Sequence, residues 1–230
     1  MNQYILLTLL AIGALPLQAQ DATLLIGDIE ANGWTLVAET KGDLDGDAQD
    51  ERVLVYDTGA EVMDGTARQL YVFQWTSVEN EAGEMTEDWQ VWLESATAVL
   101  PGKEKADDSE ADILSGLAVA DGRLTIDHQG VTESTSWTYQ HQYKLMDDNL
   151  KLVELETVAE TNCEKKLTFH HNLISGMADC TREEPSCAEG NNGSARMDFI
   201  KKAQTLPAIS DYQPGAEKMT VMGLNEEVRF

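Results

Sequence analysis

Polar and apolar side chains alternate with a period of two along much of the chain, as in strands with one buried face. In residues 135–145, aromatic side chains such as Trp137, Tyr139 and Tyr143 occupy odd positions, and polar side chains occupy the even ones. We expect this aromatic face to pack in the core, because buried aromatic residues dominate the packing of sheets. A groove for a sugar or a peptide is the alternative.

Turn sequences separate the apolar runs at short intervals. Asp121-Gly122 predicts a two-residue type I′ hairpin, and residues 147–149 and 172–176 predict two more. Residues 195–204 fit either a short helix or an edge strand. The sequence therefore predicts a mainly β protein of antiparallel sheets, arranged as a sandwich or a β-rich α+β domain with short hairpins.

The N-terminal segment has the pattern of a signal peptide. Residues 5–15 are an apolar run, which is too short for a bilayer span of about 20 residues. Ala19 is a small residue suited to the position before cleavage. We expect residues 1–19 to be removed, residues 20–230 to form a single β-rich domain, and the protein to be periplasmic or secreted. No second long apolar segment follows, so no membrane span is expected in the mature protein.

The chain is strongly acidic, with 41 Asp and Glu residues against 16 Lys and Arg residues and a net charge of −25. Such a surface repels phosphate backbones, which excludes nucleic-acid binding. Hydrophobic residues make up 42% of the chain, enough for a folded core rather than a disordered acidic tail.

One acidic segment has the spacing of a cation-binding loop. Asp43, Asp45 and Asp47 occupy its positions 1, 3 and 5, Gln49 occupies position 7, and Glu51 occupies position 9. Alternate carboxylates in a tight loop converge on one point, as a hard cation with six to eight oxygen ligands requires. Gln49 would contribute its backbone carbonyl. The segment predicts a structural calcium site, and an acidic hairpin loop without an ion is the alternative.

The loop differs from an EF-hand in two ways. Its position 12 is Leu54 instead of a bidentate glutamate, and strand-like runs flank it on both sides. Ala48 occupies position 6, where calcium loops usually have glycine for a left-handed turn. The expected affinity is no tighter than roughly 10⁻⁴ to 10⁻³ M, the range of extracellular calcium modules.

Residues 42–56, Gly-Asp-Leu-Asp-Gly-Asp-Ala-Gln-Asp-Glu-Arg-Val-Leu-Val-Tyr, resemble the calcium-binding hairpin of FG-GAP/VCBS-type repeats. The resemblance implies the same ligands, with Ala48 replacing a glycine and Glu51 an aspartate of the family pattern. Residues 124–130, 138–143 and 172–176 follow in an order similar to uncharacterised secreted bacterial proteins that carry one such loop. The resemblance spans about residues 30–180 and implies a periplasmic protein of unknown activity.

The three cysteines, Cys163, Cys180 and Cys187, all lie in the last third of the chain. An oxidising compartment permits one disulfide and leaves one free thiol. Cys187 is the expected member of that disulfide, with either Cys180 or Cys163 as its partner. Three free thiols are the remaining alternative.

Catalytic motifs are absent from the sequence, and the four histidines fit structural positions on strands. His128 and His141 lie among apolar residues, whereas the adjacent His170 and His171 would point to opposite faces of a strand. We therefore expect a non-enzymatic binding or interaction domain, whose partner is an unknown protein or glycan. An envelope hydrolase, or an inhibitor of one, is the alternative.

Overall fold

The computed structural model describes residues 26–63, 65–79, 83–102, 112–132, 134–161, 164–184 and 193–230. These residues contain one short helix and three groups of strands. The helix is α1 (Ile26–Glu30). The first group of strands is β1 (Thr35–Gly42), β2 (Glu51–Val62), β3 (Gly65–Glu79) and β4 (Met85–Ser95). The second group is β5 (Leu114–Ala120), β6 (Arg123–Val131), β7 (Thr135–Met146), β8 (Asn149–Thr161), β9 (Lys165–Asn172), β10 (Met177–Glu184) and β11 (Gly193–Ile200). The last group is β12 (Lys218–Val221) and β13 (Glu226–Arg229).

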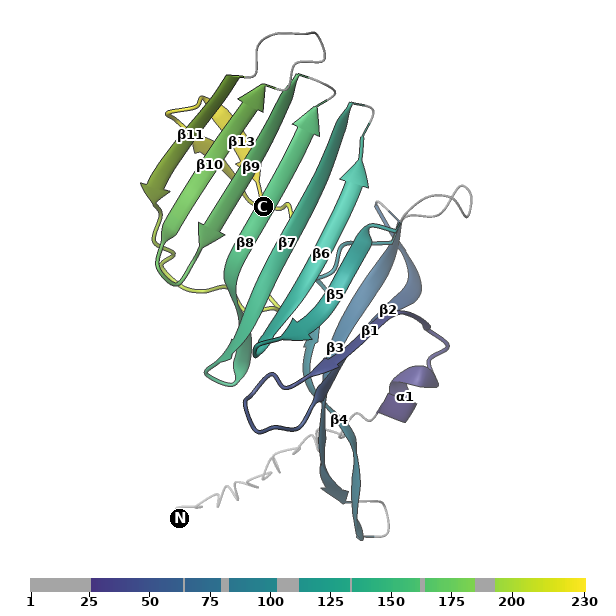
Figure 1. Ribbon diagram of the computed structural model, residues 1–230. Coiled ribbons are helices and arrows are strands. Elements are labelled where there is room, and N and C mark those ends of the chain that lie inside the picture. Colours follow the sequence, from purple (N-terminus) through teal and green to yellow (C-terminus); the bar gives the residue numbers. More distant parts are fainter. Residues whose placement is uncertain are drawn as a thin grey trace, which may run out of the picture.

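The described strands form three antiparallel sheets, as the sequence predicts. Strands β1 to β4 form a four-stranded sheet in sequence order, and β5 to β11 form a seven-stranded sheet, also in sequence order. Strands β12 and β13 pair with each other. Figure 1 shows the four-stranded sheet next to the β5 edge of the larger sheet. Each strand of the two larger sheets thus pairs with its neighbours in sequence, which is an up-and-down arrangement.

The predicted hairpins are confirmed. Asp121 and Gly122 have φ angles of 52° and 68° and join β5 to β6 in the left-handed conformation of a type I′ turn. Asp147 and Asp148, with φ angles of 53° and 57°, join β7 to β8 in the same way. Residues 172–176 form the turn between β9 and β10.

Residues 193–200 form edge strand β11, so the helical alternative for residues 195–204 is wrong. The register pairs Met197 with Cys180 and Phe199 with Ala178 on β10, whose side chains are buried. Met197 and Phe199 are spaced by two residues and pack against the same core. That spacing suits a strand, whereas a helix would separate the two side chains by about 200°.

The larger hydrophobic core lies between the sheets. One face of β2 and β3, with Val53, Val55 and Val72, joins the inner face of the seven-stranded sheet in this cluster. The opposite face of β2 and β3 carries a second cluster, which includes Phe73 and the fully buried Ile29 of α1. Strand β2 is thus buried on both faces at its start, which explains its uninterrupted apolar run.

The C-terminal segment covers the inner face of the seven-stranded sheet. Figure 1 shows this segment, in yellow, lying behind β8 to β11. Its buried side chains Ile209, Tyr212, Val228 and Phe230 belong to the larger core cluster. The amide of Leu152 on β8 donates to the carbonyl of Pro207, which fixes the segment to the sheet. Within the described ranges, no helix has the length and apolar character needed to cross a membrane.

Candidate metal centre

The acidic loop joins β1 to β2 and is anchored at both ends. β1 ends at Gly42, which lies so close to β5 that an added Cβ atom would be 2.5 Å from Cγ1 of Val119. The side chain of Leu44 is buried in the larger core cluster, although it lies within the loop. β2 begins with Glu51, whose side chain is 1% exposed. The loop is therefore fixed to the core rather than free at the surface.

Aspartate side chains shape the loop by accepting hydrogen bonds from its backbone amides. The carboxylate of Asp43 accepts from the amides of Gly46 (2.6 Å) and Ala48 (3.0 Å). Asp45 accepts from the amide of Asp47 at 3.0 Å, and Asp47 accepts from the amide of Gln49 at 2.7 Å. These local bonds replace strand pairing and turn the chain sharply.

Three of the predicted ligands lie together. One carboxylate oxygen from each of Asp43, Asp45 and Glu51 can be chosen so that all three lie within 4.8 Å of one another. Two oxygens bound to one calcium ion at 2.3–2.6 Å can be at most about 5 Å apart. The spacing is therefore compatible with a shared calcium ion, and water and backbone carbonyls would complete the coordination.

Glu51 is the buried member of the group. Burial raises the pKa of its carboxyl, and the neighbouring carboxylates of Asp45 and Asp47 raise it further. The amide of Leu44 donates to its Oε2 at 2.7 Å and opposes this effect. A cation at the loop would relieve the repulsion that raises this pKa.

The other two predicted ligands are not part of the group of three carboxylates. The Oδ2 atom of Asp47 lies 3.3 Å from the side-chain nitrogen of Gln49, and its Oδ1 accepts from the backbone amide of Gln49.

Ala48 has a φ angle of 69°, so position 6 of the loop has the left-handed conformation that glycine usually provides.

The buried histidines have structural partners. The side chain of His128 is fully buried, and its Nε2 accepts a hydrogen bond from the amide of Leu100 at 3.2 Å. His141 is also fully buried, with Nε2 at 3.1 Å from the hydroxyl of Tyr212. Burial lowers the pKa of His128 to about 4, helped by the charge of Arg68, and that of His141 to about 3. Both side chains therefore pack as neutral core residues.

The adjacent His170 and His171 point to opposite faces of β9, as expected. His171 is buried and donates from Nε2 to the backbone carbonyl of Lys201 at 2.8 Å. His170 lies between two carboxylates, with Nε2 at 2.7 Å from Glu154 and Nδ1 at 3.5 Å from Asp179. The two histidines thus cannot hold one ion together.

Cys180 is the one cysteine among the described residues, and its thiol is buried and free. Burial raises the pKa of this thiol to about 11, which keeps it protonated and unreactive. Cys163 and Cys187 lie outside the described residues. The structure thus contains no Cys180–Cys187 disulfide, and pairing of Cys187 with Cys163 stays a prediction.

Comparison of the chain with known protein families, with characterised proteins and with solved structures found no match. The candidate site therefore depends on its own geometry.

The inner face of the seven-stranded sheet contains a cavity lined by Trp137, Tyr139, Thr157 and Arg229 among others. The sequence suggests a groove along the aromatic face only as the alternative to core packing, and it does not indicate Thr157 or Arg229. Part of the aromatic face of β7 is thus core, as expected, and part is the wall of this cavity. Tyr143 is fully buried, whereas Trp137 and Tyr139 are half-buried. The alternating aromatic residues were the only signal in the sequence, because the other lining residues come from distant strands.

Proposed function

We propose that the chain is an exported, non-enzymatic binding domain whose 43–51 loop holds a structural calcium ion. The observation that carries this proposal is the convergence of the Asp43, Asp45 and Glu51 carboxylates within 4.8 Å. A buried carboxylate next to two others is unfavourable without a cation. The strongly acidic composition also suits a cation ligand and disfavours an anionic polymer.

The loop's attachments support a structural rather than a catalytic role for the ion. Leu44 extends from the loop into the core, and Gly42 packs against β5 of the other sheet. Calcium bound here would link the β1–β2 hairpin to the place where the two sheets meet. Since the unfolded chain lacks the assembled site, binding would stabilise the folded state.

The positions of three of the four histidines support a binding domain over a hydrolase. His128 and His141 are in the core, and His171 is bonded to a backbone carbonyl. The inner-face cavity is lined by aromatic, apolar and hydroxyl side chains, and its two charged residues, Glu227 and Arg229, are exposed. This composition suits recognition of a ligand.

Calorimetric titration of the chelator-treated protein with calcium tests the proposal. We expect saturable binding of one ion with a Kd of roughly 10⁻⁴ to 10⁻³ M. Asp45→Ala should abolish the binding, Asp47→Ala should weaken it less, and Asp50→Ala, outside the carboxylate group, should leave it unchanged. Equal losses of calcium affinity in Asp45→Ala and Asp50→Ala would show general electrostatic attraction instead of a specific site. Absence of a saturable heat of binding would overturn the calcium site.

Export has a separate test. N-terminal sequencing of protein recovered from outside the cytoplasm should give a start near Gln20. An intact Met1 on that material would contradict the signal peptide.

A further inference from the structure

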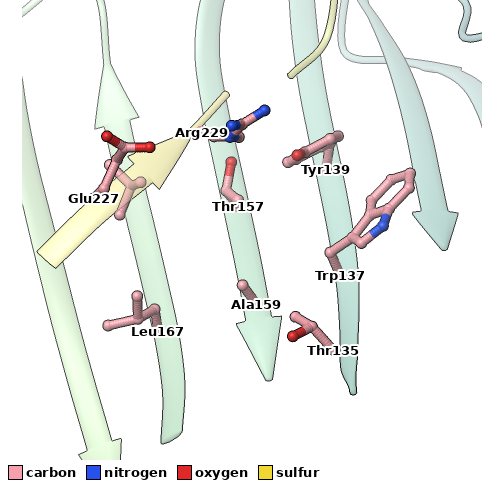
Figure 2. A pocket seen from close by; sticks show the side chains of 9 residues that line it. Thr135, Trp137, Tyr139, Thr157, Ala159, Leu167, Glu227 and Arg229 are labelled. Carbon is pink, nitrogen blue, oxygen red and sulfur yellow. The ribbon is translucent and has the colours of Figure 1, made fainter. Parts of the chain in front are cut away.

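The inner face of the seven-stranded sheet contains a cavity of about 230 Å³. Strands β7, β8 and β9 form its floor, and β13 of the C-terminal segment crosses over it (Figure 2). The volume is below the range of about 300–1,000 Å³ that is usual for drug-sized ligands. The cavity is therefore suited to a ligand with a single ring.

One side of the cavity is a fixed aromatic wall. The rings of Trp137 and Tyr139 are stacked, with centroids 4.8 Å apart and planes inclined by 28°. The indole of Trp137 also lies across Gly130 on β6, where an added Cβ atom would collide with the ring. Ala159 and Leu167 complete the apolar part. A planar apolar group would find a preformed surface here.

The cavity also contains an unsatisfied polar group next to the aromatic wall. Thr157 is 5% exposed, and its hydroxyl has no hydrogen-bond partner in the described part of the chain. A buried hydroxyl without a partner is costly, which points to a ligand or water that accepts from it. In Figure 2, the polar ends of Thr157, Tyr139 and Arg229 lie toward one another.

Arg229 is distinct from the other arginines. Five of the six arginines in the chain form an ion pair, and Arg229 forms none with the described residues. Burial raises the pKa of the Tyr139 hydroxyl, and the positive charge of Arg229 opposes that rise, so the two groups are near each other. In a chain with a net charge of −25, an arginine without a carboxylate partner at the edge of a cavity is well placed to receive one from a ligand.

We propose that this cavity binds a small aromatic carboxylate. Its ring would pack against Trp137, and its carboxylate would accept hydrogen bonds from Arg229 and Thr157. This inference rests on the proposed binding role and gives that role a ligand class, but it does not require calcium in the 43–51 loop.

Titration of the ¹⁵N-labelled full chain with benzoate, followed by NMR, tests the inference. The indole N–H signal of Trp137, assigned with Trp137→Phe, should shift and saturate. Benzamide, which has the same ring without the charge, should bind about tenfold more weakly or worse, because a charged hydrogen bond is lost. Arg229→Gln should weaken benzoate binding to a similar extent, and Thr157→Val should weaken it less. Arg196→Gln, which removes an exposed arginine of β11, should leave it unchanged.

Three results would overturn the inference: no saturable shift with benzoate, equal affinity for benzamide and benzoate, or tighter binding of the sugar acid glucuronate than of benzoate. The titration is run both with chelator and with calcium, and a calcium-dependent shift of the amide signals of residues 43–51 reports on the loop separately. A benzoate response without that loop shift would refute only the calcium site, and the loop shift without a benzoate response would refute only this inference.

Discussion

Ala48 has an unusual backbone conformation within the candidate calcium loop. Its φ angle of 69° lies in the left-handed region, where a Cβ atom is unfavourable. Its amide donates to the carboxylate of Asp43, so this conformation helps to bring Asp43 into the loop. The loop thus has its turned shape at a cost of about 1 kcal/mol.

Replacing this residue tests the conformation. Ala48→Gly should raise the free energy of unfolding by about 1 kcal/mol, both with chelator and with calcium, since the left-handed conformation relaxes in either state. Gly46→Ala is the matched opposite, because Gly46 has a φ angle of 87° with open space around it, and it should lower stability by a similar amount. Urea denaturation measures both changes in stability. An Ala48→Gly variant with the same free energy of unfolding as the wild type would argue against the left-handed turn.

His128 and His141 link stability to pH at the residue scale. The amide of Leu100 donates to Nε2 of His128, so protonation of that nitrogen would break the hydrogen bond. The Nδ1 atoms of both side chains are buried and have no hydrogen-bond partner in the described ranges. The folded state therefore excludes the charged form of each ring.

Acidification from pH 7 to pH 5 should destabilise the protein through these two residues. Below about pH 6.5 the unfolded chain takes up protons at both histidines, while the folded chain, with pKa values of about 4 and about 3, does not. Stability thus falls as the pH drops, by about 2 kcal/mol per histidine at pH 5. The double variant His128→Gln/His141→Gln should lose most of this fall in denaturation measurements. The same slope in variant and wild type would contradict neutral burial.

At the scale of elements, the end of β1 depends on its close approach to β5. The space beside Gly42 is filled by Val119, so only a residue without a side chain fits there. This contact sets the position of the loop that starts at the next residue. It also joins the four-stranded sheet to the edge strand of the larger sheet.

Gly42→Ala should therefore destabilise the protein by about 1–3 kcal/mol, the usual cost of overpacking. Gly27→Ala is its control, because an added Cβ atom in α1 meets nothing within 4 Å. That control should be neutral or slightly stabilising, since alanine favours a helix more than glycine does. Thermal unfolding of both variants measures the difference, and equal melting temperatures would argue against the contact between β1 and β5.

Local patterns predicted elements well where each hairpin contains its own signals. The Asp121-Gly122 turn and the aromatic alternation of β7 are correct because strand and turn preferences agree there. Helix α1 was missed because five residues are too few for a helical period. The sequence does not distinguish a strand from a helix for residues 195–204, because the outer face of β11 is exposed and only Met197 and Phe199 indicate its buried side.

At the scale of the whole molecule, the ligand spacing of the loop was predictable, whereas the only predictable part of the cavity was its aromatic wall. The ligand spacing is local, so Asp43, Asp45 and Glu51 could be identified within nine residues. The burial of Glu51 depends on the packing of β2 between two clusters, which a single segment does not reveal. The inner-face cavity needs β7, β8, β9 and β13 together, and only the folded topology brings Thr157 next to Arg229.

The acidic composition of the whole chain adds to the local crowding of carboxylates in the loop, and we expect both to favour cation binding. The chain has 41 acidic residues, and a calcium ion bound to the loop would neutralise part of that charge at the place where the two sheets meet. Exposed charges across the surface are screened by salt, whereas a coordinated ion is held by direct ligands. With a structural calcium site, the stability of the fold should therefore rise in millimolar calcium and should not rise in sodium chloride of equal ionic strength.

Thermal unfolding with chelator and with calcium tests the calcium loop most directly. At a calcium concentration ten times the Kd, binding should stabilise the fold by about 1.4 kcal/mol and raise the melting temperature by about 4 °C. Asp45→Ala should lose this rise in melting temperature, and the control variant Asp50→Ala should keep it. Sodium chloride at matched ionic strength should not reproduce the rise in the wild-type protein. The same melting temperature for the wild-type protein in chelator and in millimolar calcium would contradict the account and reduce the segment to an acidic hairpin without an ion.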